Sequence, residues 1–285
     1  MIAFWRRLPV IVRAALIGGL VATLGTLPWA LLVSLNIKYG SAVPWAVAPT
    51  ALYLWFFWRY VRGAGWPRAT AEARRTLARA NPVPDDMWGL AIFAGLLGLV
   101  VVLLLQTIMS RLVTIPQQQD IDPSKFPLMT VFLWVLMSAA VAGVVEETAF
   151  RGYLQGPIER RHGPVIAILV TGILFGLLHF THPEVTLVLM PFYLAVATVY
   201  GTLAYLTNSI WPGMVLHAGG NVFAAFDLFA RGHSEWQGLG PPAKLIWETG
   251  ADAAFWTSLA ATLAVGAAAV WAFGMLARLR RAPPQ

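Results

Sequence analysis

The chain has 285 residues, of which 58% are hydrophobic and only 12% are charged, and it contains no cysteine. This composition is too apolar for a soluble domain, and the lack of cysteine excludes disulfides, thiolate metal ligands and a cysteine nucleophile. The formal net charge of +7 comes from arginines in short loops between apolar runs, which indicates contact with a lipid surface and argues against nucleic acid as a partner.

Apolar runs of about 20 residues recur along the whole chain, and each is long enough to cross a bilayer as an α-helix. In chain order they cover residues 10–36, 43–62, 87–113, 127–154, 164–181, 185–206, 209–230 and 252–277. The sequence therefore predicts an all-α fold, a single polytopic bundle of about eight transmembrane helices over residues 1–285.

The basic residues predict how this bundle is oriented. An even number of spans places both termini on one side. With that side cytoplasmic, the outer side holds only five of the 20 basic residues, namely Lys38, Arg111, Lys125, Arg231 and Lys244. The positive-inside rule favours this orientation. We expect a multi-pass protein of the cytoplasmic (inner) membrane with both termini in the cytoplasm.

The connector between the second and third spans is polar. Its residues 69–80, A-T-A-E-A-R-R-T-L-A-R-A, predict a short basic helix at the membrane surface. A solvated connector without such a helix is the alternative.

The fourth span contains two adjacent carboxylates and an arginine, in V-V-E-E-T-A-F-R-G at 144–152. Ionisable side chains at membrane depth are costly and usually mark a functional site. Glu147 and Arg151 have the i, i+4 spacing of an intrahelical ion pair. Adjacent residues of an α-helix point about 100° apart, so we expect Glu146 to face the pocket without Glu147, as the carboxylate free to act as a general base.

Two later spans add polar groups. Phe175 and His179 share one helix face in the fifth span, and His217 and Asn221 do so in the seventh. The joint occurrence of polar groups in three spans predicts one shared site. Counted along straight helices, His179 would lie about 22 Å and His217 about 12 Å from the inner boundary. A shared site therefore requires that residues 160–164 enter below the membrane surface, or that the fifth helix starts later or tilts.

These side chains suit peptide hydrolysis. A carboxylate beside a histidine activates water for attack on an amide carbonyl, and a second histidine with an asparagine amide stabilises the oxyanion. Zinc held by Glu146, His179 and His217 is an alternative, although no H-E-x-x-H sequence is present.

Two non-hydrolytic functions compete with this interpretation. One is a proton- or ion-coupled transporter, for which buried carboxylates and histidines are equally suited. The second is a non-catalytic immunity or scaffold protein. The asparagine favours hydrolysis over transport, because a proton relay needs no oxyanion donor.

Three motifs carry a resemblance to a known family. E-E-T-A-F-R-G at 146–152, F-G-L-L-H at 175–179 and H-A-G-G-N at 217–221 resemble the E-E-x-x-x-R, F-x-x-x-H and H-x-x-x-N motifs of the CAAX prenyl endopeptidase family. More narrowly, the chain is similar to the bacterial CPBP intramembrane proteases, also described as CAAX protease self-immunity proteins. The resemblance covers residues 127–225, which we expect to form the catalytic core.

The resemblance implies an eight-helix, glutamate-dependent intramembrane endopeptidase. In this family pattern Glu146 is the base, His179 is its partner, and His217 and Asn221 form the oxyanion site. Glu147, Arg151 and Phe175 carry over as supporting residues. The resemblance favours hydrolysis without a cofactor, with zinc as the alternative. Because the alanine-rich, arginine-over-lysine composition is typical of bacteria, the expected substrate is a membrane-associated polypeptide and not a prenylated CAAX protein.

Overall fold

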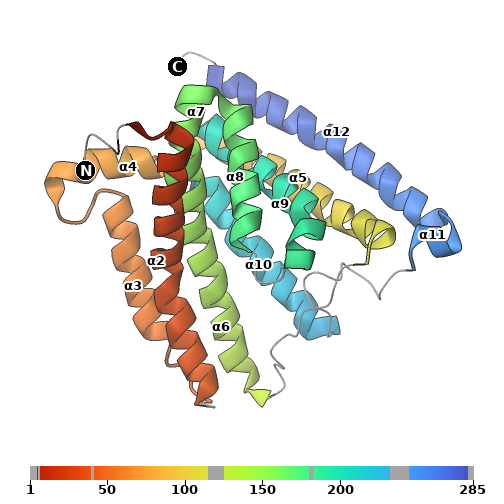
Figure 1. Cartoon of the computed structure of the whole chain (residues 1–285), viewed down its shortest axis with the longest axis horizontal. Helices are drawn as coiled ribbons and strands as arrows, with labels where there is room; N and C mark the ends of the chain where they lie inside the picture. The colour runs from red at the N-terminus through yellow and green to blue at the C-terminus, as the bar shows by residue number, and fades with distance from the viewer. Residues whose placement is uncertain are drawn as a thin grey trace.

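The computed structural model describes residues 5, 7–39, 42–114, 125–179, 183–231 and 244–281, in which helices are joined by turns and irregular segments and no strand occurs (Figure 1). The elements are α2 (Val10–Lys38), α3 (Val47–Val61), η1 (Arg68–Thr70), α4 (Ala71–Ala78), α5 (Asp85–Leu112), α6 (Leu128–Val141), η3 (Ala142–Gln155), α7 (Gly156–His162), α8 (Pro164–Leu178), α9 (Pro183–Thr207), α10 (Trp211–Arg231), α11 (Ile246–Thr249) and α12 (Ala253–Arg281). Each predicted span coincides with a helix.

Five helices of the described chain are long and apolar enough to cross a membrane, by length and composition. They are α2, α5, the continuous helix Leu128–His162 formed by α6, η3 and α7, residues 187–207 of α9, and α12. The apolar α8 is shorter, because it ends at Leu178 and not at the predicted residue 181. These helices confirm the all-α membrane bundle.

The outer surface of the bundle is apolar. On α2, the side chains of Leu16, Leu20, Leu24, Leu27 and Leu31 are all exposed. A continuous apolar stripe of this kind would be costly in water, whereas it matches the hydrocarbon core of a bilayer. The exposed face of α2 is therefore a lipid-facing surface.

The first residues of α2 and the last residues of α12 lie at the same end of the bundle. In Figure 1, α2 begins and α12 ends at the upper end, and α4 lies across that end, at a steep angle to α2. This arrangement agrees with an even number of crossings. The orientation of α4 also agrees with the predicted short helix at the membrane surface.

The alternative of a solvated connector before α5 is wrong. Arg74 of α4 is 5% exposed, and its guanidinium donates hydrogen bonds to the carbonyls of Tyr60, Gly65 and Pro67 at 2.7 to 2.8 Å. One buried side chain thus satisfies three backbone acceptors of the turn between α3 and α4. The connector is an ordered part of the bundle.

The opposite end of α2 is fixed by Asn36, which is fully buried. Its amide donates to the Val43 carbonyl at 3.0 Å. Its carbonyl oxygen accepts the Ala46 N–H at 3.1 Å and the Trp134 indole N–H at 3.4 Å. The side chain therefore joins α2, the start of α3 and α6.

The start of α12 is held by Asp252. Its carboxylate caps the helix by accepting the Phe255 N–H at 2.9 Å and pairs with Arg111 of α5 at 3.0 Å. The Phe255 hydrogen bond, followed by the Arg111 hydrogen bond, holds the pKa of this carboxyl below its usual value. This cap connects α12 to the end of α5.

The segment that contains the two glutamates lies at the centre of the bundle, and close backbone approaches hold it there. A Cβ atom added to Gly25 of α2 would overlap the Val145 side chain, and one added to Gly152 would meet the Ala78 backbone of α4 at 2.8 Å. A Cβ on Gly143 would meet the Met214 carbonyl of α10 at 2.9 Å. The helix η3 is thus packed directly against α2, α4 and α10.

Candidate active site

The motif with the two glutamates lies on a π-helix, η3. A π-helix closes its turns with i→i+5 hydrogen bonds, is rare, and occurs frequently at functional sites. Its turn holds more residues than an α-helical turn, so neighbouring side chains diverge by less than 100°. The prediction that Glu146 and Glu147 cannot both face one pocket squarely assumed α-helical geometry; in this segment both carboxylates lie near one histidine of α10.

His217 of α10 lies between the two carboxylates. Its Nδ1 is 2.9 Å from Oε1 of Glu147, and its Nε2 is 3.8 Å from Oε2 of Glu146. Because an ionised carboxylate only accepts hydrogen bonds, the short contact places a proton on Nδ1. In neutral His217 the lone pair is then on Nε2, directed towards Glu146.

The two glutamates differ in their surroundings. The Glu147 side chain is fully buried, and its Oε1 also lies 3.4 Å from Nη1 of Arg151, which confirms the predicted i, i+4 pair. The Glu146 side chain is 18% exposed. The charge of Glu147 is therefore compensated by Arg151, and its carboxylate is held by Arg151 and His217. Glu146 is the carboxylate that a substrate or water can reach.

Arg151 is enclosed by aromatic rings. Its guanidinium carbon lies 5.3 Å from the ring centroids of Phe175 and Tyr200 and 5.9 Å from that of Phe150. Guanidinium groups at such distances are attracted by the ring faces. The rings and Glu147 together compensate a charge that is 0% exposed.

His179 lies directly after the last residue of α8. Its Nδ1 is 2.8 Å from the Phe175 carbonyl, and because a carbonyl only accepts, Nδ1 carries the proton and donates. Its ring contacts Phe175 at 4.6 Å and stacks on Tyr193 at 5.1 Å. Phe175 also contacts the His217 ring at 6.5 Å, so it joins the two histidines.

Both histidines thus contact the ring of Phe175, although counting along straight helices places them at different depths in the membrane. The helix α8 begins at Pro164, the predicted start, so a later start is not the explanation. Figure 1 shows α10 crossing the bundle at a clear tilt relative to α8. Asn221 follows His217 by one turn on α10 and is half-buried, as expected for a side chain that lines a site.

Sequence reasoning missed three residues that contact the site. Tyr200 and Tyr193 of α9 stack on His217 and His179, with ring centroids 5.2 Å and 5.1 Å apart. Their spacing of seven residues in an apolar helix was the available signal. Gly213 lies against Glu147, since an added Cβ would be 2.7 Å from Oε2. No motif marks this glycine.

The described residues contain no group of three histidine, aspartate or glutamate side chains arranged to hold a metal ion. The zinc set of Glu146, His179 and His217 therefore gains no support from the geometry of the described chain. The contacts instead arrange the two glutamates and His217 as a line of proton acceptors and donors.

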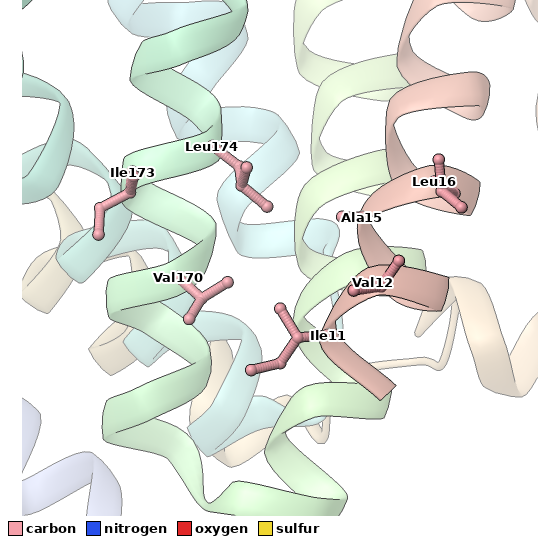
Figure 2. A pocket seen from close by; sticks show the side chains of 7 residues that line it. All are labelled: Ile11, Val12, Ala15, Leu16, Val170, Ile173 and Leu174. Carbon is pink, nitrogen blue, oxygen red and sulfur yellow. The ribbon is translucent and has the colours of Figure 1, made fainter. Parts of the chain in front are cut away.

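A groove of about 450 Å³ opens on the side of the bundle (Figure 2). It is lined by apolar side chains from residues 11–16 of α2 and 170–174 of α8 and contains no titratable group. This groove therefore belongs to the apolar outer surface of the bundle.

Residues 128–223 match the model of the type II CAAX prenyl endopeptidase Rce1-like family. No match was found among curated proteins or among solved structures. The matched segment contains all three motifs and the helices η3, α8 and α10 that bring them together, so the family resemblance read from the motifs is confirmed. Residues 128–223 of this multi-pass membrane protein are therefore similar to the type II CAAX prenyl endopeptidase Rce1-like family.

Proposed function

We propose that this chain is an intramembrane endopeptidase in which Glu146 activates a water molecule to hydrolyse a peptide bond of a membrane-associated polypeptide. The position of His217 between Glu146 and the buried Glu147 carries the proposal. The family match supports the endopeptidase class. The buried, lipid-surrounded location of the cluster supports a substrate that reaches the site from the membrane.

The geometry suits a water molecule between Glu146 and His217. Their 3.8 Å separation is too long for a direct hydrogen bond, and two acceptors facing each other suit a bridging donor. Glu147 keeps His217 in the tautomer with the proton on Nδ1, so that Nε2 accepts one water hydrogen. Glu146 accepts the other.

The reaction then follows from these positions. The water oxygen forms a bond to the carbonyl carbon while one of its protons passes to Glu146. The carbonyl oxygen becomes negative and accepts a hydrogen bond from the Asn221 amide. When the carbon–nitrogen bond breaks, Glu146 returns the proton to the departing amine.

The proposal changes the predicted role of His217. In its neutral form, its single N–H is bound to Glu147, so it can donate to an oxyanion only after it has gained a proton. We therefore assign His217 to orienting the water and Asn221 to the oxyanion. The predicted role of His179 as a second partner of the water depends on Nε2, because its Nδ1–H is bound to the Phe175 carbonyl.

A reporter-cleavage assay with the purified protein in a bilayer tests this mechanism. Glu146→Gln should abolish cleavage and leave thermal stability close to that of the wild type, because Glu146 is partly exposed. Glu147→Gln is the matched control: it removes the charge partner of a fully buried Arg151 and should cost about 3–5 kcal/mol of stability. Cleavage retained by Glu146→Gln would contradict the mechanism.

Three competing hypotheses give different results in the same system. A zinc enzyme would contain stoichiometric metal and lose activity on chelation, whereas water activation by Glu146 predicts chelator-resistant cleavage. A non-catalytic scaffold or immunity protein would keep its cellular effect in Glu146→Gln. A transporter would move protons or ions without producing peptide fragments.

We place the protein in the cytoplasmic membrane with both termini in the cytoplasm, as the distribution of its basic residues predicts. The shared end of the bundle for α2 and α12 supports the common side. Reporter fusions to each end test the orientation. We also propose that the chain belongs to the bacterial CPBP branch and that its substrate carries no prenyl group.

A further inference from the structure

Helix α9 carries two buried tyrosines, and each stacks on one of the two site histidines. Tyr193 is 4% exposed, and its ring centroid lies 5.1 Å from that of His179 with an interplanar angle of 29°. Tyr200 is 3% exposed, and its ring centroid lies 5.2 Å from that of His217 with an interplanar angle of 15°. Seven residues are about two helical turns, so both rings project from one side of α9.

The plane of the His217 ring decides the arrangement of the site. A partial rotation about its Cβ–Cγ bond would tilt the ring out of its present plane and move both ring nitrogens. Nδ1 would then leave Glu147 and Nε2 would leave Glu146. The corresponding torsion of histidine is broad, so a neighbouring group must hold the ring in one plane.

Tyr200 is placed to hold this plane. Its ring is nearly parallel to the imidazole, and tilting the imidazole out of its present plane would break that stacking. The Arg151 guanidinium lies 5.3 Å from the same ring. Tyr200 therefore contacts both groups that hold Glu147, on the side formed by α9.

The tyrosine also reaches the turn that carries Asn221. A Cβ atom added to Gly220 would lie 3.8 Å from the Tyr200 hydroxyl oxygen. The ring thus extends from Arg151 past His217 to the backbone next to Asn221. No other described ring stacks on His217 at so small an interplanar angle.

We propose that Tyr200 is a positioning residue that fixes the ring plane of His217, so that Nδ1 binds Glu147 and Nε2 faces Glu146. The proposal rests on the proposed function, because it assigns Tyr200 to the same hydrolytic site. It requires the aromatic ring of Tyr200 and not its hydroxyl group.

Two variants at this position separate positioning from ordinary packing. Tyr200→Leu keeps an apolar side chain in the core but removes the ring; we expect kcat to fall about tenfold with little change in KM. The pH dependence of kcat should shift as well, because the imidazole loses its fixed contact with Glu147. Tyr200→Phe keeps the ring and should restore kcat to within about threefold of the wild type.

Tyr205→Leu is the control on the same helix, since that ring lies under Arg280 at 4.0 Å and contacts neither site histidine in the described chain. It should leave kcat and its pH dependence unchanged. If Tyr200→Leu behaves like Tyr205→Leu, or if Tyr200→Phe loses as much activity as Tyr200→Leu, the assignment to the ring is wrong.

A measurement without substrate keeps this test separate from the proposed function. The chain has five histidines, so nitrogen NMR of ¹⁵N-histidine-labelled protein can resolve His217, assigned by loss of its signals in His217→Gln. We expect one tautomer, protonated on Nδ1, in the wild type and Tyr200→Phe, and a mixture in Tyr200→Leu. Unchanged His217 signals in Tyr200→Leu would overturn the proposal even if cleavage is observed. Altered signals without any cleavage in the wild type would refute the proposed function alone.

Discussion

Gly213 of α10 lies against the carboxylate that orients His217. An added Cβ atom would be 2.7 Å from Oε2 of Glu147, whereas ordinary contact begins at 3.4 Å. In Gly213→Ala the carboxylate must therefore move by about 0.7 Å. It has little freedom to do so, because Glu147 is fully buried between His217 and Arg151.

The expected loss follows from the contacts that this movement weakens. The 2.9 Å bond between Nδ1 of His217 and Oε1 of Glu147 is charge-assisted, and such bonds contribute about 1.5–3 kcal/mol. If this energy is lost from the transition state, kcat/KM falls about 10- to 100-fold. A misplacement near 1 Å in other catalytic sites costs about 100-fold.

Steady-state cleavage of a membrane reporter by Gly213→Ala measures this loss, normalised to folded protein because overpacking also lowers stability by about 1–3 kcal/mol. The matched control is Gly266→Ala in α12, where an added Cβ meets nothing within 4 Å. Both substitutions replace glycine by alanine within a helix, so the gain in stability from helix propensity is the same in the two variants. Wild-type kcat/KM and pH dependence in Gly213→Ala would refute the inference that Glu147 must stay in place.

Two further predictions concern the scaffold. Asn36→Ala removes the acceptor of the buried Ala46 N–H, so we expect a loss of about 1–3 kcal/mol. Thermal unfolding in detergent measures it, with Asn81→Ala, whose single described side-chain bond is exposed, as the milder control. A Tm loss no larger than that of the control would contradict the role of Asn36. For Asp252, the pKa in the folded protein is below the unfolded value, so its cap is fully present above the unfolded pKa and is lost as the pH falls through the folded pKa. Hydrogen exchange of the Phe255 amide, corrected for intrinsic rate, should therefore accelerate between about pH 5 and pH 3 in the wild type. Asp252→Asn should remove most of this pH dependence, and an equal dependence in both proteins would argue against the cap.

The helices and the meeting of the three motifs could be predicted from the sequence, because both depend on strong signals. Apolar length identifies spans such as α5, and polar residues are too costly in such spans to occur in three of them by accident. The Glu147–Arg151 pair followed in the same way from its spacing.

The position of His217 between both glutamates could not be predicted. It depends on the π-helical turns of η3, and a pattern of apolar and polar residues does not distinguish i→i+5 from i→i+4 hydrogen bonding. The meeting of His179 and His217 around Phe175 likewise depends on the tilt between α8 and α10, which no residue spacing encodes. Tyr200 and Gly213 were missed because a tyrosine and a glycine in an apolar helix have the same pattern as ordinary packing residues.

The most direct test of the account is a comparison of membrane peptides from cells that contain either the wild type or Glu146→Gln at equal abundance. The account predicts that fragments of at least one membrane-associated polypeptide appear with the wild type, and that the intact precursor accumulates with the variant. The same cleaved fragments in both samples would contradict the central claim that Glu146 activates the water for hydrolysis.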